Sequence, residues 1–266
     1  MLSGMVSAKQ QHNQSGFTLI ELAIVLLISG ILVIPLLNMY TMYLKKQAVL
    51  LTIERVKLVA GDLSITKGAN LALPCPASRT MVFGDAMFGK SICNDPLLGP
   101  AVNLLPLGGC LPGNGICKIA GSRDADGVGG LDPILIGAVP FVDLALGSNT
   151  FLSQGDVLDG WGNRLEYAVS AKLTPMAGPA PASSETHKFG VIAAVDEFGR
   201  PTASIGTIDI NNDGAINNLD ANGQFVVFSH GQNGMGAFSS GGVQISPCVA
   251  GTRDAENCNN DATFMR

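Results

Sequence analysis

One uncharged apolar run constrains the fold of this chain more than any other feature. Leu22–Leu44 contains no charged side chain and consists mostly of Leu, Ile, Val and Ala. An α-helix of about 20 such residues is long enough to cross a bilayer. A secretory signal peptide would carry a small-residue cleavage site after the run, but the residues from Asn38 to Lys46 contain no Ala-x-Ala pattern. We therefore expect the run to remain in the mature protein as a membrane helix.

The residues that lead into this run form a compact motif, which reads Gly-Phe-Thr-Leu-Ile-Glu over positions 16–21. It resembles the type IV prepilin signature of pilins and of type II secretion pseudopilins, and it matches that pattern at Gly16, Phe17, Thr18, Leu19 and Glu21. The resemblance implies that a prepilin peptidase with N-methyltransferase activity removes residues 1–16 as a leader peptide after Gly16. The same enzyme would then methylate the new amino terminus at Phe17.

Glu21 is the charged residue that borders the apolar run. A carboxylate at the edge of a membrane helix is costly to bury and is usually paired. Cleavage after Gly16 would leave a free amine on Phe17, four residues before Glu21. A pair between Glu21 of one subunit and the Phe17 amine of a neighbour would fix the axial register of packed helices, because sliding would leave both charges unpaired. The alternative is that Glu21 lies in the headgroup layer of a solitary helix.

The helix is predicted to continue beyond the span, residues 17–44, as an amphipathic segment over residues 45–70. Its apolar side chains recur at helical spacing and should pack on a globular head. These side chains are Val49, Ile53, Val56, Ala60 and Leu63, whereas Arg55, Lys57 and Asp62 lie off this stripe. Gly68 is expected to cap the helix, and Pro35 should kink it because proline lacks a backbone N–H.

Residues 71–266 are predicted to form the head. The chain contains 33 Gly and 14 Pro, which indicates many turns. The expected fold class is α+β, with a long N-terminal α-helix packed on an antiparallel β-sheet head that carries loop insertions, a layout that the resemblance describes as pilin-like. The expected strands are Pro133–Leu146, Arg164–Val169, Phe189–Val195, Ala203–Ile210 and Gln224–Ser229.

The segment from Asp159 to Tyr167 contains the only Trp of the chain, Trp161. It is similar to a turn-and-strand segment of major pseudopilins of type II secretion, in which Asp-x-Trp-Gly-Asn precedes a strand. We interpret Trp161 as an apolar anchor between helix and sheet rather than as a ligand-stacking residue.

Six cysteines follow the membrane segment, and none precedes it. They are Cys75, Cys93, Cys110, Cys117, Cys248 and Cys258. Sequence neighbours favour the pairs 75–93, 110–117 and 248–258, although six cysteines allow 15 connectivities. No Cys-x-x-Cys occurs and the chain has three His, so zinc is not expected. A disulfide framework indicates an oxidising compartment, either the periplasm or the cell exterior.

The basic residues favour the opposite orientation. Lys45, Lys46, Arg55 and Lys57 follow the span, while the leader carries only Lys9. The positive-inside rule alone would leave the body in the cytoplasm. Because the cysteines and the family resemblance both favour an exterior head, we predict a single-pass inner-membrane protein with a periplasmic head that is surface-exposed if the chain enters a pilus.

A second motif, over residues 209–220, fits the twelve-residue calcium loop. Gly214 occupies the sharp turn that requires glycine, and the last position is Asp rather than the usual Glu. The expected calcium ligands are Asp209, Asn211, Asp213, the Ala215 carbonyl, Asn217 through a water, and Asp220. The alternative is an Asn- and Asp-rich turn that binds no metal.

The sequence contains no Gly-x-Ser-x-Gly, phosphate-binding glycine loop or His-Glu-x-x-His, and His187 and His230 are isolated, so no enzymatic role is predicted. The net charge of −5 argues against a nucleic-acid coat, and no specific nucleic-acid partner is expected. The sequence therefore predicts a structural subunit of a type IV pilus or type II secretion filament, whose partners are other subunits, the processing enzyme and the inner membrane. The alternative is a membrane-anchored, calcium-dependent extracellular binding domain that does not polymerise.

Overall fold

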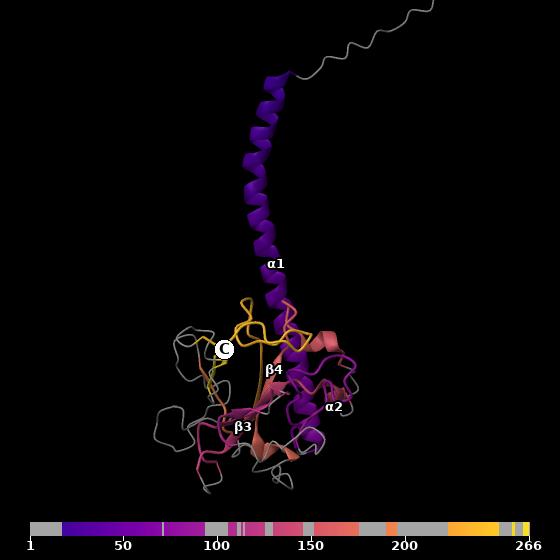
Figure 1. Cartoon of the computed structure of the whole chain (residues 1–266), viewed down its shortest axis with the longest axis vertical. Helices are drawn as coiled ribbons and strands as arrows, with labels where there is room; N and C mark the ends of the chain where they lie inside the picture. Colours follow the sequence, from indigo (N-terminus) through magenta and orange to yellow (C-terminus); the bar gives the residue numbers. More distant parts are fainter. Residues whose placement is uncertain are drawn as a thin grey trace, which may run out of the picture. The chain divides into compact units, whose positions relative to one another are not determined.

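The structure is a computed structural model that describes residues 18–70, 72–93, 106–110, 113, 115–125, 130–145, 152–175, 190–195, 223–249, 257–258 and 263–265. It divides into two compact units, Met1–Lys46 and Gln47–Arg266, which are described separately. The predicted α+β layout is confirmed: a long apolar N-terminal helix and an antiparallel five-stranded sheet are its main elements (Figure 1).

The first element is helix α1, Leu19–Asn70. It runs unbroken through Pro35 and ends two residues beyond Gly68, so the expected cap position is wrong. In the first unit every described residue from Thr18 onward is exposed, including Leu19 at 87% and Met42 at 70%. This part of α1 therefore buries none of its apolar surface within its own unit.

The main sheet lies in the second unit, and all its neighbouring strands are antiparallel. In spatial order it consists of β1 (Gly109–Cys110), β2 (Cys117–Ala120), β3 (Pro133–Ala138), β4 (Glu166–Ser170) and β6 (Phe225–Phe228). A parallel pair, β5 (Ala193–Val195) with β7 (Thr263–Met265), forms a second small sheet that the sequence did not predict. The short helices are α2 (Phe141–Ala145), η2 (Gln154–Val157) and η3 (Ala171–Leu173).

Both faces of β3, β4 and β6 are buried, and alternate residues of these strands enter different cores. On β3, Leu135 packs in one core with Val59 and Leu63 of α1, while Ile134 and Ile136 belong to a second core. The second core also holds residues from the chain around β5 and β7, namely Val191, Ile192 and Phe264. Burial on both faces explains why β3 reads as a continuous apolar run rather than as an alternating one.

The buried face of α1 agrees with the predicted stripe at Val56 and Leu63, which pack in the first core, but not at the start of the stripe. Val49 and Ile53 are 43% and 45% exposed, whereas Val59 is fully buried along with Leu63. Thr52 on the same face is only 8% exposed. The prediction counted apolar residues alone, but a threonine hydroxyl can be buried when it is hydrogen-bonded, and Thr52 Oγ1 donates to the Ala48 carbonyl at 2.8 Å. The packed face is therefore rotated relative to the predicted one, and it also includes Asp62 and Thr66.

The predicted strand Pro133–Leu146 is only partly correct. Strand β3 ends at Ala138, and α2 begins at Phe141, directly after Pro140. Proline has no N–H for the ladder and its fixed φ suits a helix start, and the Pro140 carbonyl accepts hydrogen bonds from the N–H groups of Asp143 and Leu144. The strands expected at 164–169 and 224–229 are present as β4 and β6, Phe189–Val195 contributes β5, and Ala203–Ile210 lies outside the described residues.

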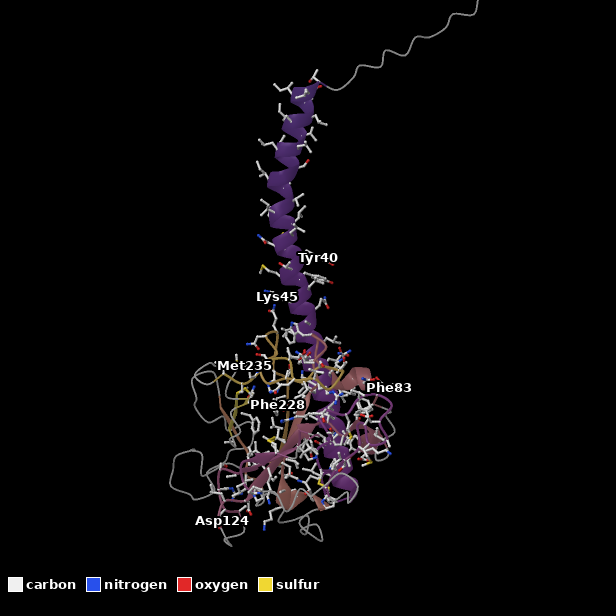
Figure 2. The ribbon with its side chains drawn as sticks, viewed as in Figure 1. Tyr40, Lys45, Phe83, Asp124, Phe228 and Met235 are labelled. Carbon is white, nitrogen blue, oxygen red and sulfur yellow. A yellow bond between two sulfur atoms is a disulfide. The ribbon has the colours of Figure 1, made fainter. Side chains whose placement is uncertain are left out.

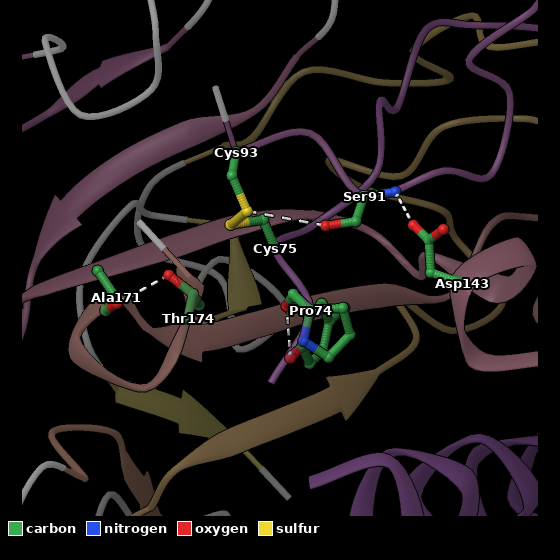
Figure 3. The surroundings of a disulfide bond; sticks show 8 residues. Pro74, Cys75, Ser91, Cys93, Asp143, Ala171 and Thr174 are labelled. Atoms are coloured by element: carbon green, nitrogen blue, oxygen red, sulfur yellow. Dashed lines mark hydrogen bonds between the residues drawn. A yellow bond between two sulfur atoms is a disulfide. The ribbon is translucent and has the colours of Figure 1, made fainter. Parts of the chain in front are cut away.

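All six cysteines are paired, in the connectivity that sequence neighbours favoured: Cys75–Cys93, Cys110–Cys117 and Cys248–Cys258. Cys110 and Cys117 are also register partners of β1 and β2. Figure 3 shows the Cys75–Cys93 bond beside Ser91, whose backbone N–H donates to the Asp143 carboxylate of α2. The disulfides therefore fix loops that have little regular structure of their own.

A tight turn at Asp159–Asn163 joins α1 to the sheet. The Asp159 carboxylate accepts hydrogen bonds from the backbone N–H groups of Trp161 and Asn163, and from the Ser229 hydroxyl at 2.8 Å. The turn meets α1 where the Gly160 N–H donates to Thr52 Oγ1 at 2.8 Å. Trp161 itself is only half-buried and belongs to neither core, so its predicted anchor role is wrong; the anchoring residue is Asp159.

Arg164, directly after this turn, binds two loops, residues 78–81 and residues 239–240. Its guanidinium donates to the carbonyls of Ser78, Met81, Ser239 and Ser240 at 2.5–3.2 Å. It also lies over the Phe88 ring, 5.2 Å from the centroid. Such a fork of donors suits several carbonyls at once, which a lysine ammonium would not match.

We predict that Gly160→Ala destabilises the second unit, because a Cβ at this position would lie 2.0 Å from the Ala48 carbonyl oxygen of α1. Overpacking of this kind costs about 1–3 kcal/mol, measurable as a lower midpoint in thermal unfolding of the full chain. Gly155→Ala is the matched control, because its Cβ would meet only Ser153 Oγ at 3.5 Å. Equal midpoints for the two variants would contradict the close approach of turn and helix.

Candidate functional site

The start of α1 carries a capping box. The Thr18 backbone N–H and hydroxyl both donate to Glu21 Oε2 at 2.9 Å, and the Glu21 N–H donates to Thr18 Oγ1 at 3.3 Å. Reciprocal bonds between an N-cap Thr and a Glu three residues later satisfy backbone donors that a helix start otherwise leaves unpaired. The Glu21 carboxylate is therefore held against Thr18 at the start of the helix. Thr18 directly follows Phe17 in the sequence.

The helix that begins at this cap is long and apolar enough to cross a membrane, by length and composition. Its most apolar stretch is not buried in the structure. Tyr40 in Figure 2 illustrates this, because its ring projects from α1 and is 59% exposed. A continuous exposed apolar surface marks a site for lipid or for another protein. We therefore expect lipid or another protein to cover this segment of α1.

The other predicted site residues divide into two groups. Gly16, Phe17 and the whole loop Asp209–Asp220 lie outside the described residues. Within the part of the chain that the structure describes, no group of three or more His, Cys, Asp or Glu side chains is placed to hold a metal. The calcium site therefore remains a prediction.

The head contains a buried polar cluster that the sequence did not predict, because His230 is isolated in the sequence. Arg79 Nη2 lies 2.6 Å from Glu166 Oε2, and His230 Nε2 lies 3.4 Å from Glu166 Oε1. The side chains of Glu166 and His230 are only 2% and 1% exposed. The three residues are far apart in the chain. His230 reaches Glu166 because β6 pairs with β4, with Phe228 opposite Glu166. Arg79 reaches it because Ala77 forms a bridge to Ala138, the β3 residue that pairs with Glu166. The one signal in the sequence was a charged residue at the start of an otherwise apolar strand.

The charged neighbours of Glu166 determine whether its side chain is ionised. Burial alone would raise the pKa of Glu166, but Arg79 and His230 beside the carboxylate hold that pKa below its ordinary value. Glu166 is therefore a carboxylate at neutral pH, balanced by the Arg79 guanidinium.

We predict that Glu166→Gln destabilises the head by about 3–5 kcal/mol at neutral pH, because it leaves the buried Arg79 charge without its partner. The folded pKa of Glu166 is lowered, so its stabilisation is complete above the unfolded pKa of about 4.3 and is lost as the pH falls through the folded pKa. Urea unfolding from pH 7 to pH 3 should show the gap between wild type and E166Q narrowing below about pH 4. E54Q, at an exposed carboxylate of α1, is the control; a gap independent of pH would contradict the ion pair.

Comparison with known proteins gives one match. Residues 11–37 match the family model described as the prokaryotic N-terminal methylation motif. The match covers residues 11–16 of the predicted leader, the predicted cleavage position after Gly16 and the first part of the apolar helix, and it does not extend to the head. No curated protein and no solved structure matches the chain. The motif implies processing by a prepilin peptidase and assembly with other pilin subunits. The chain thus carries, at the start of α1, the signature of type IV pilins and pseudopilins.

Proposed function

We propose that this protein is a structural subunit of a type IV pilus or of a type II secretion pseudopilus, and that it is not an enzyme. The observation that carries the proposal is the methylation motif placed at the capped start of a long, exposed apolar helix. Proteins with this motif are typically structural. The disulfide-bonded head supports a position on the periplasmic or outer side of the inner membrane.

Glu21 is proposed to act in assembly. Cleavage after Gly16 makes Phe17 the amino terminus, directly before the N-cap Thr18. The capping box keeps the Glu21 carboxylate at this same end of α1, where the amine of a neighbouring subunit can reach it. In an apolar bundle of helices, an amine and a carboxylate that neutralise each other fix the stagger between subunits.

The competing proposal is a membrane-anchored, calcium-dependent binding domain that never polymerises. It shares the membrane helix and the head, and it differs in leaving the apolar surface of Thr18–Gln47 to lipid alone. Contact between the helices of two copies separates the two proposals.

We also propose that the loop Asp209–Asp220 binds calcium. Its three aspartates repel one another without a cation, so calcium should stabilise the folded loop. The carboxylate at position 12 belongs to the shorter Asp220, which favours the weak affinity of extracellular calcium modules, about 10⁻⁴–10⁻³ M.

We predict that Glu21→Ala leaves processing intact and abolishes assembly. Mass spectrometry of the purified wild type and of E21A should both show a methylated Phe17 as the first residue. A photo-crosslinker in place of Leu27 should join copies of the wild type, with at least about a tenfold lower yield in E21A, because each unpaired charge costs several kcal/mol in an apolar medium.

Two further variants control this experiment. Gly16→Glu should retain Met1 and thereby report loss of processing alone, and E54Q should crosslink as the wild type does. The filament proposal fails if native protein keeps its first sixteen residues. The binding-domain proposal gains if processed wild-type protein never crosslinks.

For the calcium loop, we predict that 10 mM Ca²⁺ stabilises the full chain by about 1.5–3 kcal/mol, from the mass-action relation and the affinity range above. Asp213→Ala should remove this gain in thermal unfolding, since it deletes the ligand at position 5. Asn212→Ala, at a position that supplies no ligand, should keep it. An equal calcium effect in both variants would place the cation elsewhere.

A further inference from the structure

A cavity of about 260 Å³ opens in the head beside the Arg79–Glu166–His230 cluster. The disulfides Cys110–Cys117 and Cys248–Cys258 both contribute to its wall. Apolar wall is supplied by Ile136, Phe238 and Phe264. The volume lies below the range of about 300–1,000 Å³ that is typical of drug-sized ligands, so a ligand of this cavity must be small.

The polar wall of the cavity carries buried atoms without hydrogen-bond partners among the described residues. Both ring nitrogens of His230, Glu166 Oε1 and Arg79 Nε are of this kind. The 3.4 Å between His230 Nε2 and Glu166 Oε1 is an ion-pair distance that does not meet hydrogen-bond geometry. A buried polar atom without a partner costs about 1–3 kcal/mol, and several of them around one cavity indicate a ligand that satisfies them.

The charges of the cluster define the ligand. With His230 neutral, Arg79 and Glu166 balance each other, and an added anion would leave a net negative charge in a buried site. With His230 protonated, the cluster carries one net positive charge, which a monoanion neutralises. A dianion such as a phosphate would overcompensate this charge.

We propose that this cavity binds a small monocarboxylate and that binding protonates His230. The donors that face the carboxylate are the Arg79 Nε–H and the imidazolium N–H, and an apolar tail lies against Phe238 and Phe264. Arginine and imidazolium are both strong donors to carboxylates. This inference concerns the head alone, so it is independent of filament assembly.

His230 is the side chain that takes up the proton when the carboxylate binds. The charged side chains that face it are Glu166 on β4 and, through Glu166, Arg79. The other polar groups of the cavity wall, Gln244 and Asn257, do not titrate, and the wall cysteines are disulfide-bonded. The lowered pKa of Glu166 keeps it ionised, so the proton that is taken up on binding resides on the imidazole of His230.

The test uses the full chain in detergent micelles and benzoate as the probe. Calorimetric titration should show saturable binding at pH 5.5, at least about tenfold weaker at pH 7.5, because binding and protonation are linked. Repeating the titration in buffers of different ionisation enthalpy at pH 7.5 should give an uptake of about one proton per benzoate. Benzamide, the neutral analogue, should not bind, and phenylphosphonate should bind more weakly than benzoate at pH 7.5.

His230→Gln is the decisive variant, because glutamine is polar but does not take up a proton. H230Q should lose the pH dependence of benzoate binding, whereas H187Q, the same substitution at another histidine, should retain it. A second readout in the wild type is the imidazole ¹⁵N shift of His230, which benzoate should move from the neutral to the protonated value at pH 7.5. This readout decides the matter if H230Q does not fold.

The proposal is overturned by no saturable binding at pH 5.5, by equal binding of benzamide, or by a neutral His230 in the benzoate complex.

Discussion

The apolar first part of α1 must be covered by something other than its own unit. From Thr18 to Gln47 every described side chain is exposed, and most of the side chains in this stretch are apolar. Exposing a continuous apolar surface of this size to water is unfavourable, so lipid or neighbouring helices must bury it. The capping box at Thr18 and Glu21 gives this helix a defined start, which is what a structure built by stacking such helices needs.

In the second unit, a loop-rich head packs on the amphipathic part of α1. Hydrogen bonds of polar side chains make many of the contacts that hold it there. Asp159 organises the turn that meets Thr52, and Arg164 donates hydrogen bonds to carbonyls of two loops, residues 78–81 and residues 239–240. Figure 2 shows Phe228 among the packed side chains of the head, where it is only 6% exposed, while Phe83 lies at the head surface and is 80% exposed. Apolar packing stabilises the two cores, and directional hydrogen bonds with three disulfides fix the loops around them.

The Arg79–Glu166–His230 cluster brings three ionisable side chains together in the interior of the head. A buried ion pair contributes little net stability, because desolvation offsets the attraction between the charges. This cluster also lines a cavity and carries polar atoms that have no hydrogen-bond partner among the described residues, so a ligand explains it better than folding does. In this proposal the head combines a place in an assembly with recognition of a small molecule.

Local patterns determined the outline of this protein. The uncharged run predicted α1, the residues at 16–21 predicted the processing motif, and neighbouring cysteines favoured the observed pairs. The predicted β3 ran too far because a short apolar run does not show where Pro140 converts strand to helix. Tertiary structure alone decided which face of α1 is buried, since Thr52 hydrogen-bonds to its own helix and to Gly160, a contact between residues 108 positions apart. It also brought Arg79, Glu166 and His230 together: strand pairing sets such contacts, and no local pattern of residue types records which strands will pair.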